Sequence, residues 1–213
     1  MEITWLGHAC FRIRGRDTTV LTDPCPPTTG YRIGRVTADL VTVSNDGPES
    51  NYRQAVTGDT KFIEAAGEYE IGGVLISGAR TDRAANEDEG RVRNIAFVMD
   101  IDDIIVCHLG SISQVPSTDD VERLSGADVL LVPVGGGRGL DAVRAAETVN
   151  LLEPRLVIPM QFKTDAATGE LDPLDRFLKE MGAEGKQPEP KLSVTRSTIP
   201  ANTTVLVLGY RGQ

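Results

Sequence analysis

The chain has little of what secreted, metal-binding and membrane-spanning proteins are rich in. Its 213 residues include two histidines and three cysteines, and no two of the cysteines have CxxC spacing. An odd number of cysteines without ligand spacing argues against a disulfide framework and favours reduced thiols. No apolar run approaches the roughly 18 residues of a membrane span, and the first residues lack the pattern of a signal peptide. We therefore expect a cytoplasmic protein.

Basic residues are also scarce. The chain has 22 Lys and Arg against 31 Asp and Glu, which gives a net charge of −9, and no run of Lys or Arg interrupts this. Such a surface repels phosphate backbones and anionic lipids, so we expect neither a nucleic-acid nor a membrane partner. A chain that is 40% hydrophobic at this length can bury a core without disulfides. We expect one domain that spans residues 1–213.

The first half of the sequence is typical of short strands. The β-prone runs are separated by Gly, Pro and Asp, and their close spacing predicts mostly antiparallel sheet. These runs are Ile3–Gly7, Cys10–Arg14, Thr18–Thr22, Asp39–Ser44, Lys61–Ala65, Tyr69–Ile71, Val74–Ser77, Asn94–Met99 and Asp103–His108. The polar stretch Asp82–Arg93 has no apolar periodicity, which predicts a mobile surface loop.

The second half alternates between strands and helices. Asp128–Val134 and Arg155–Met160 are continuous apolar runs, as expected for strands buried on both faces. Helices are predicted from a cap at Ser117 or Thr118 to Leu124, and over Gly139–Leu152 and Pro173–Met181. The chain closes with predicted strands at Lys191–Arg196 and Thr203–Leu208, after a flexible connection over Gly182–Pro190. This pattern predicts an α/β protein with two packed sheets and helices outside them.

Short motifs in a fixed order connect the chain to a known family. They are Trp5–Phe11 (WLGHACF), Thr22–Pro24, Val43–Ser44, His108–Gly110, Leu131–Gly137 and Ile158–Met160. Together they resemble the metallo-β-lactamase superfamily, in particular its small bacterial metal-dependent hydrolases related to the ascorbate-phosphate lactonases. The resemblance runs from Met1 to about Thr164. It implies a four-layer αββα sandwich of two mixed sheets, which in relatives holds one or two zinc or manganese ions.

The same resemblance indicates where metal ligands would lie. The family's His-x-His-x-Asp-His motif falls on Asn45–Ser50, in which the spacers Asp46 and Pro48 match those of this branch. The positions that correspond to ligands are Asn45, Gly47, Glu49, Ser50, Arg83, Ser111 and Gln161. We interpret these residues, with Asp46, as the remnant of a metal site, bordered by Asp23 and His108.

The residue types at these positions do not suit a divalent cation. Zinc in proteins takes three or four imidazole, thiolate or carboxylate ligands, and only Glu49 supplies one. An arginine at position 83 would add a repulsion of about 4 kcal/mol per unit charge at about 4 Å and an effective dielectric constant of about 20. Without a metal to lower the pKa of water, the family's nucleophile is not formed. The expectation is a protein without a metal cofactor and without catalysis, which binds a partner or serves a structural role.

Two other functions stay open at this stage. The chain could hydrolyse a small ester, lactone or phosphate compound with a relocated metal or a metal-free site, or it could be a subunit of a larger assembly. The expected partner is a small anionic ligand or a protein, and self-association into a homo-oligomer is open. Arginines 80, 83, 91 and 93 surround the predicted loop, and could face such an anion.

The remaining polar residues each have a structural and a functional interpretation. His8 and His108 are favoured as structural hydrogen-bonding residues, with ligand contact as the alternative for His108. For Asp23 an Asx turn is favoured. Ser50 and Ser111 have no evident base and no G-x-S-x-G elbow. The loop of Gly135, Gly136, Gly137 and Arg138 is either an anion cradle or a turn for close packing.

Overall fold

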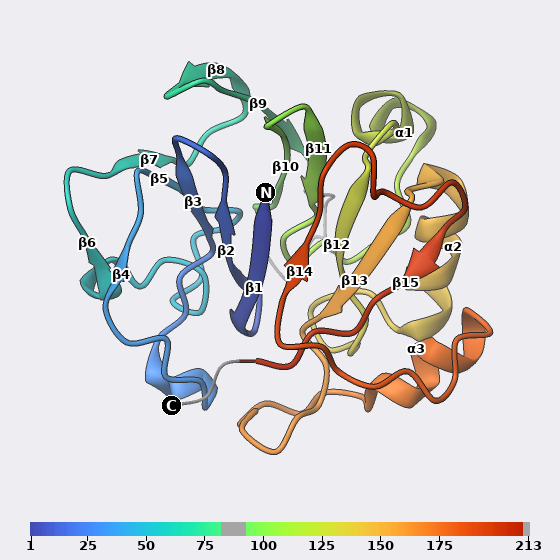
Figure 1. The fold of residues 1–213 in the computed structure, drawn as a ribbon. Helices are drawn as coiled ribbons and strands as arrows, with labels where there is room; N and C mark the ends of the chain where they lie inside the picture. Colours follow the sequence, from blue (N-terminus) through green and yellow to red (C-terminus); the bar gives the residue numbers. More distant parts are fainter. Residues whose placement is uncertain (82–92, 211–213) are drawn as a thin grey trace.

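Two β-sheets face each other in the computed structural model of the chain, which describes residues 1–81 and 93–210 (Figure 1). The order of the first sheet is β14-β1-β2-β3-β5-β7, and that of the second is β15-β13-β12-β11-β10-β9-β8. The strands of the first sheet are β1 (Glu2–Gly7), β2 (Cys10–Arg14), β3 (Thr19–Thr22), β5 (Leu40–Thr42), β7 (Lys61–Ile63) and β14 (Leu192–Ser193).

The second sheet contains both long and short strands. They are β8 (Gly67–Ile71), β9 (Val74–Arg80), β10 (Ile95–Ile101), β11 (Ile104–His108), β12 (Val129–Pro133), β13 (Leu156–Met160) and β15 (Thr204–Val205). A separate pair of short strands, β4 (Val36–Thr37) and β6 (Val56–Thr57), lies beside the first sheet (Figure 1). The two strands near the C-terminus, β14 and β15, are shorter than the sequence predicts. The predicted architecture of two sheets is confirmed.

Both sheets are mixed, and their parallel parts determine where loops meet. β3 pairs in parallel with β5, and β5 with β7. In the second sheet, β11, β12, β13 and β15 are parallel neighbours. Because parallel strands end at the same edge of a sheet, the loops that follow β3, β5, β11, β12 and β13 gather at two adjoining edges. The polar residues of interest lie in these loops.

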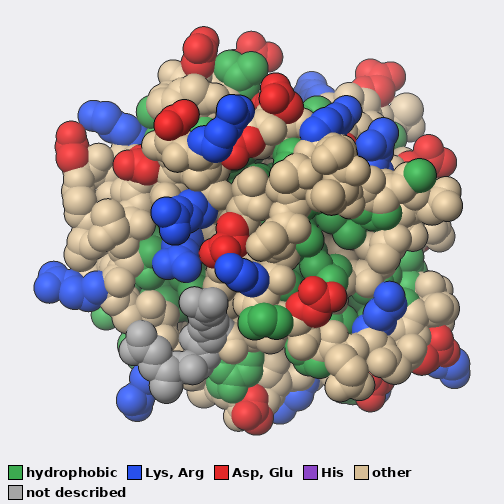
Figure 2. Space-filling model, viewed as in Figure 1, with side chains coloured by type: hydrophobic (Ala, Val, Ile, Leu, Met, Phe, Trp, Pro, Cys, Tyr) green, Lys and Arg blue, Asp and Glu red, His purple; other side chains and the backbone are tan. Residues whose placement is uncertain are grey.

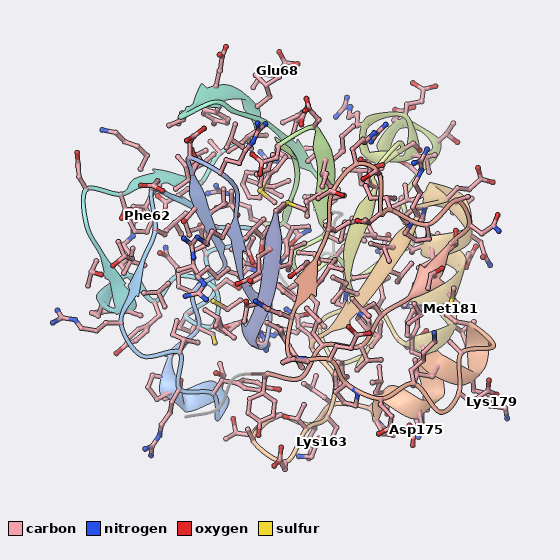
Figure 3. The ribbon with its side chains drawn as sticks, viewed as in Figure 1. Phe62, Glu68, Lys163, Asp175, Lys179 and Met181 are labelled. Atoms are coloured by element: carbon pink, nitrogen blue, oxygen red, sulfur yellow. The ribbon has the colours of Figure 1, made fainter. Side chains whose placement is uncertain are left out.

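The helices follow the predicted capping chemistry. α1 (Thr118–Leu124) is capped by Ser117, one of the two predicted caps, and Asp120 completes a capping box with it. α2 (Ala142–Leu152) is capped by Asp141, and α3 (Leu174–Glu180) follows Pro173. Figure 1 shows α2 and α3 next to β13 and β15, on the flank of the molecule away from β4 and β6. Figure 3 places Asp175 and Lys179 on α3, with Met181 just after its end.

The core between the sheets is built from the strands that the apolar pattern predicts. Trp5, Phe11, Phe97 and Met99 are almost fully buried in it. The three cysteines are free thiols, and all are buried as small core residues. Within residues 1–81 and 93–210, no helix is long and apolar enough to cross a membrane.

A buried carboxylate joins the C-terminal segment to the second sheet. Asp128, which is 3% exposed, accepts hydrogen bonds from the Ile105 backbone N–H at 3.0 Å and from Arg196 at 2.7 Å. Arg155 lies 3.9 Å away on the other carboxylate oxygen. A buried charge is tolerated only when it is paired and hydrogen-bonded, and these contacts supply both conditions.

We predict that Asp128→Ala lowers the free energy of unfolding by about 2–3 kcal/mol, because it leaves the Ile105 N–H and two guanidinium groups without their acceptor. Urea titration of the purified variant measures this, with Asp59→Ala on an exposed turn as the matched control. A loss no larger than that of the control would contradict the assigned role of Asp128.

Candidate functional site

Loops from both sheets meet at a cluster of polar side chains. Asn45 and Ser50 lie in the loop after β5, Ser111 follows β11, and Gln161 follows β13. We call these four residues the polar cluster. Asn45, Ser50 and Gln161 are each at most 5% exposed, whereas Ser111 is half-buried. The structure therefore brings together residues that the sequence places up to 116 positions apart (161 − 45).

Asn45 is the central hydrogen-bonding residue of the cluster. Its Oδ1 accepts from the Gly47 backbone N–H at 2.9 Å, which orients the amide. Its Nδ2 donates to Ser44 Oγ and to Ser50 Oγ at 3.0 Å each, and lies 3.5 Å from Ser111 Oγ. The amide nitrogen, not the oxygen, thus faces the middle of the cluster.

Ser111 is held from two sides. Its backbone N–H donates to Asn94 Oδ1 at 2.9 Å, and its Oγ accepts from Gln161 Nε2 at 3.0 Å. Asn94 in turn donates to Thr81 Oγ1 and to the Leu109 carbonyl. Sequence reasoning missed Asn94, because a single asparagine at the start of a predicted strand carries no signal of its own.

A positive backbone φ of 62° at Gly110 lets the chain pass close to its neighbours. A Cβ at this position would lie 2.5 Å from Asn94 Oδ1 and 2.6 Å from the Ser44 Cβ. Glycine is required here because only it combines a left-handed conformation with such close approach. This turn directs Ser111 towards the cluster.

His8 also belongs to the site, although the sequence favoured a structural role for it. It occupies the turn between β1 and β2 with φ of 51°, and its carbonyl accepts from Trp5 Nε1 at 3.0 Å. Its Nε2 lies 3.5 Å from Gln161 Nε2. Burial lowers the pKa of His8, and the nearby Glu49 carboxylate partly opposes this. His8 is therefore a neutral imidazole at neutral pH, next to the cluster.

Asp23 lies beneath the cluster and is fully buried. Its carboxylate accepts from the Ser44 backbone N–H at 2.7 Å and from the Ser44 hydroxyl. Burial raises the pKa of Asp23 to about 7, although the hydrogen bonds from Ser44 act in the opposite direction. The loop that carries Asn45 is thereby attached to the end of β3.

Charged residues lie in the same loops as the cluster residues. Glu49 pairs with Arg138 at 3.5 Å, and Asp46 pairs with Arg93 at 3.2 Å. The Glu49 carboxyl group also fills the space beside Gly47, where a Cβ would lie 2.7 Å from Glu49 Cδ. Arg83, Arg91 and most of the predicted mobile loop lie outside the described residues, so their expected roles stay predictions.

His108 lies in the core and not at the edge of the cluster. It is 0% exposed, its Nε2 lies 3.0 Å from the Ala9 carbonyl oxygen, and its ring packs edge-on against Phe11. Burial lowers the pKa of His108 to about 4. This position favours the structural interpretation of His108.

The glycine loop packs against the backbone of Gln161. The Gly136 N–H donates to the Leu140 carbonyl at 2.9 Å, and the Gly139 N–H donates to the Gly136 carbonyl at 3.0 Å. A Cβ on Gly135 would lie 2.1 Å from the Gln161 carbonyl oxygen. These contacts fit a close-packing turn better than the alternative of an anion cradle at Gly135, Gly136, Gly137 and Arg138. Figure 3 shows Lys163 in the loop that follows β13.

The donor set does not fit a zinc or manganese ion. Within residues 1–81 and 93–210, no group of three or more His, Cys, Asp or Glu side chains could hold a metal. At the polar cluster, amide and hydroxyl groups hydrogen-bond to one another, the Glu49 carboxylate is paired with Arg138, and the Asp23 carboxylate is bonded to Ser44. Neutral amides and hydroxyls are poor substitutes for the imidazole and carboxylate ligands of such sites.

Comparisons with known proteins identify the family. A model described as the β-lactamase superfamily domain matches residues 2–161. The UPF0173 protein PF0020 of Pyrococcus furiosus is 31% identical over 208 residues, which cover 85% of this chain and 90% of the relative. The chain therefore belongs to the β-lactamase superfamily and, within it, to the UPF0173 family. A UPF0173 metal-dependent hydrolase of Archaeoglobus fulgidus is 24% identical over 216 residues, which cover 87% and 92% of the two chains.

A solved structure confirms the predicted fold. The protein from Thermotoga maritima described as a "putative zn-dependent hydrolase of the metallo-beta-lactamase superfamily" superposes with a TM-score of 0.82 at 34% identity. The match covers 99% of each chain. The metallo-β-lactamase sandwich with two mixed sheets is thus correct for this protein.

The same comparisons correct the expected function. The sequence led us to expect a non-catalytic protein, a pseudoenzyme, because the ligand positions carry Asn, Gly, Ser and Gln. That expectation is wrong, since the relatives over nearly the whole chain are named metal-dependent hydrolases. The error came from equating one set of metal ligands with activity. The alternative of a hydrolase agrees better with these relatives.

We predict that Asp23→Asn makes stability less dependent on pH. The pKa of Asp23 is about 7 in the folded chain against an ordinary 3.8, so the protonated acid stabilises the fold below about pH 4. That contribution is lost as pH rises through about 7, and three pKa units correspond to about 4 kcal/mol.

The measurement is the free energy of unfolding of wild type and variant between pH 4 and pH 8. The difference between the two proteins is the useful quantity, because the lowered pKa of His108 gives both of them a slope of opposite sign. Wild type should lose stability relative to Asp23→Asn as pH rises, and parallel curves would show that Asp23 is ionised throughout.

We predict that Gly135→Ala lowers the free energy of unfolding by about 1–3 kcal/mol, because the new methyl group meets backbone atoms that cannot move aside easily. Gly169→Ala is the matched control, since a Cβ there meets no atom closer than 4.0 Å. Urea titrations of the two variants decide this. Equal stability would contradict the close packing of the glycine loop against Gln161.

Proposed function

We propose that this protein is a hydrolase of a small ester, lactone or phosphate compound, and that it acts at the polar cluster without a metal ion. The main support for this proposal is the position of the cluster, where the loops after β5, β11 and β13 meet. The relatives of the chain are named hydrolases. The chemistry of the donor set supports the metal-free form. The proposed reaction involves no metal ion.

In this proposal, His8 acts as the general base. An imidazole that is neutral at neutral pH can accept a proton from water, and general bases of this kind typically contribute about 100-fold to 10,000-fold in rate. The turn at His8 is fixed through its carbonyl by Trp5 Nε1 and by the Gln161 backbone N–H at 3.4 Å. The ring is therefore held near the polar cluster without a flexible backbone.

The proposed reaction balances with water alone. His8 takes one proton from water while the water oxygen forms a bond to the carbonyl carbon or phosphorus of the substrate. The bond to the leaving oxygen then breaks, and the leaving oxygen takes the proton from the imidazolium of His8. The products are an acid and an alcohol, and His8 returns to its neutral form. The Glu49 carboxylate stabilises the positive charge that forms on His8 during the reaction.

We predict that the purified protein hydrolyses at least one member of a panel of generic esters, lactones and phosphodiesters, and that a metal chelator leaves the rate unchanged. His8→Gln should lower kcat/KM by about 100-fold or more, because it removes the base and keeps a hydrogen-bonding side chain. Ser111→Ala should also lower kcat/KM, whereas Ser77→Ala on an exposed position of β9 should not.

Initial rates measured over pH 5–9 complete the test. The acid limb of kcat/KM should lie below pH 6.5, the ordinary pKa of histidine, because burial lowers the pKa of His8. No turnover across the panel, with zinc, with manganese and without either, would refute the proposal. Turnover that a chelator abolishes would refute its metal-free form.

A further inference from the structure

We infer that hydrogen peroxide converts Cys10 and Cys25 into a reversible disulfide, which joins the hairpin that carries His8 to the segment that follows β3. Both cysteines are free thiols in the reduced chain. The inference goes beyond the proposed function and does not depend on it, since the bond is detected by mass and not by turnover. The positions of the two residues in the fold carry it.

Cys10 closes the turn between β1 and β2, where it is paired with Gly7 of the opposite strand. The residues on both sides of Cys10 are attached to the end of β3. Thr22 Oγ1 donates to the Ala9 carbonyl at 2.8 Å and accepts from the Phe11 N–H at 3.0 Å. The backbone of Cys10 is thus held beside the last residue of β3.

The chain turns back towards this hairpin directly after β3. Asp23 has a φ of 36°, a left-handed conformation that is uncommon outside glycine. Cys25 Sγ then lies 3.8 Å from the carbonyl oxygen of Gly7, the residue paired with Cys10. The two cysteine side chains pack in the same apolar cluster and hydrogen-bond to each other. A disulfide therefore only shortens an existing contact, to a bond of about 2.05 Å.

The two thiols differ in their readiness to react. The hydrogen bond from Cys10 lowers the pKa of the Cys25 thiol, although burial opposes this. Burial raises the pKa of the Cys10 thiol. Because the thiolate is the form that attacks a peroxide, Cys25 is the sulfur that is oxidised first, and Cys10 is the thiol that resolves it.

Hydrogen peroxide takes up the two electrons that the thiols lose. The Cys25 thiolate bonds to one peroxide oxygen while the O–O bond breaks, and the departing hydroxide takes up the proton that Cys25 released. The Cys10 sulfur then bonds to the Cys25 sulfur, the S–O bond breaks, and the hydroxide leaves with the proton of Cys10. Two thiols and one peroxide thus give one disulfide and two water molecules.

Burial sets the rate of this reaction. Neither Cys10 nor Cys25 is exposed to solvent, so peroxide reaches them only when the segment after β3 opens locally. The disulfide should therefore form more slowly than one between exposed thiols. A dithiol reductant such as dithiothreitol should reverse it.

Cys107 supplies an internal control. It lies in β11 and packs in the larger apolar cluster, to which neither of the other two cysteines belongs. Burial raises the pKa of Cys107 to about 12. This thiol should stay reduced under the conditions that link the other two.

Mass spectrometry of the whole protein tests the inference. Reduced wild-type protein is treated with hydrogen peroxide in its folded state, then unfolded and alkylated with N-ethylmaleimide. The chain should lose two hydrogens and take up one alkyl group instead of three, with Cys10 and Cys25 in one linked peptide. Dithiothreitol before alkylation should restore all three sites.

Three alanine variants assign the bond, because alanine keeps each site apolar. Cys107→Ala should form the same disulfide at the wild-type rate, whereas Cys10→Ala and Cys25→Ala should form none. The bond closes a loop of 15 residues (25 − 10), which should raise the Tm of oxidised wild type by about 5 °C or more. Peroxide-treated Cys25→Ala is the control for other effects of the oxidant on Tm.

Several outcomes would overturn the inference. They are three alkylated cysteines after peroxide treatment, a link that includes Cys107, and sulfinic acid at Cys25 without a disulfide. A linked protein with no gain in Tm would contradict a bond formed from an existing contact. The predicted link, found in wild type and in Cys107→Ala but in neither of the other variants, would support it, whether or not the protein hydrolyses an ester.

Discussion

The hydrogen bonds of Asn45 are the constraint on which the rest of the site depends. A buried amide must satisfy both its oxygen and its nitrogen within the protein, since an unpaired polar group away from water costs about 1–3 kcal/mol. Asn45 does so with Gly47, Ser44 and Ser50, all in its own loop. Its remaining contact reaches Ser111 on the second sheet. One side chain thereby fixes the shape of a loop, and the hydrogen bond of 2.8 Å from the Ile95 N–H to the Ser44 carbonyl attaches that loop to the second sheet.

Much of the fold could be predicted from the sequence because apolar patterns act locally. The buried parallel strands β12 and β13 are continuous apolar runs, and α1 is capped by Ser117, one of the two caps that the sequence predicts. The short terminal strands were predicted too long, because β propensity does not show where a pairing partner ends. β14 pairs with β1 over two positions, although the apolar pattern continues beyond them.

The site was less predictable, because its geometry depends on contacts between distant segments. Of the ligand positions inferred from the resemblance, Asn45, Ser50, Ser111 and Gln161 lie together, yet nothing in the sequence indicated that Asn94 holds Ser111 or that His8 lies beside Gln161. The acidic and basic side chains interspersed on the surface in Figure 2 likewise give no sign of which pairs border an opening. Function was misjudged because the loss of metal ligands was taken to mean the loss of catalysis, whereas the relatives are named metal-dependent hydrolases.

The distances along the chain between cluster partners have a consequence for folding. Asn45 and Ser111 are separated by 66 residues, Ser111 and Gln161 by 50, and His8 and Gln161 by 153. Contacts of such high sequence separation form only after long loops have closed, which is a slow event relative to local structure. The docking of the two sheets is therefore the step that creates the site, and a chain with one sheet formed holds its serines and amides in water, unassembled.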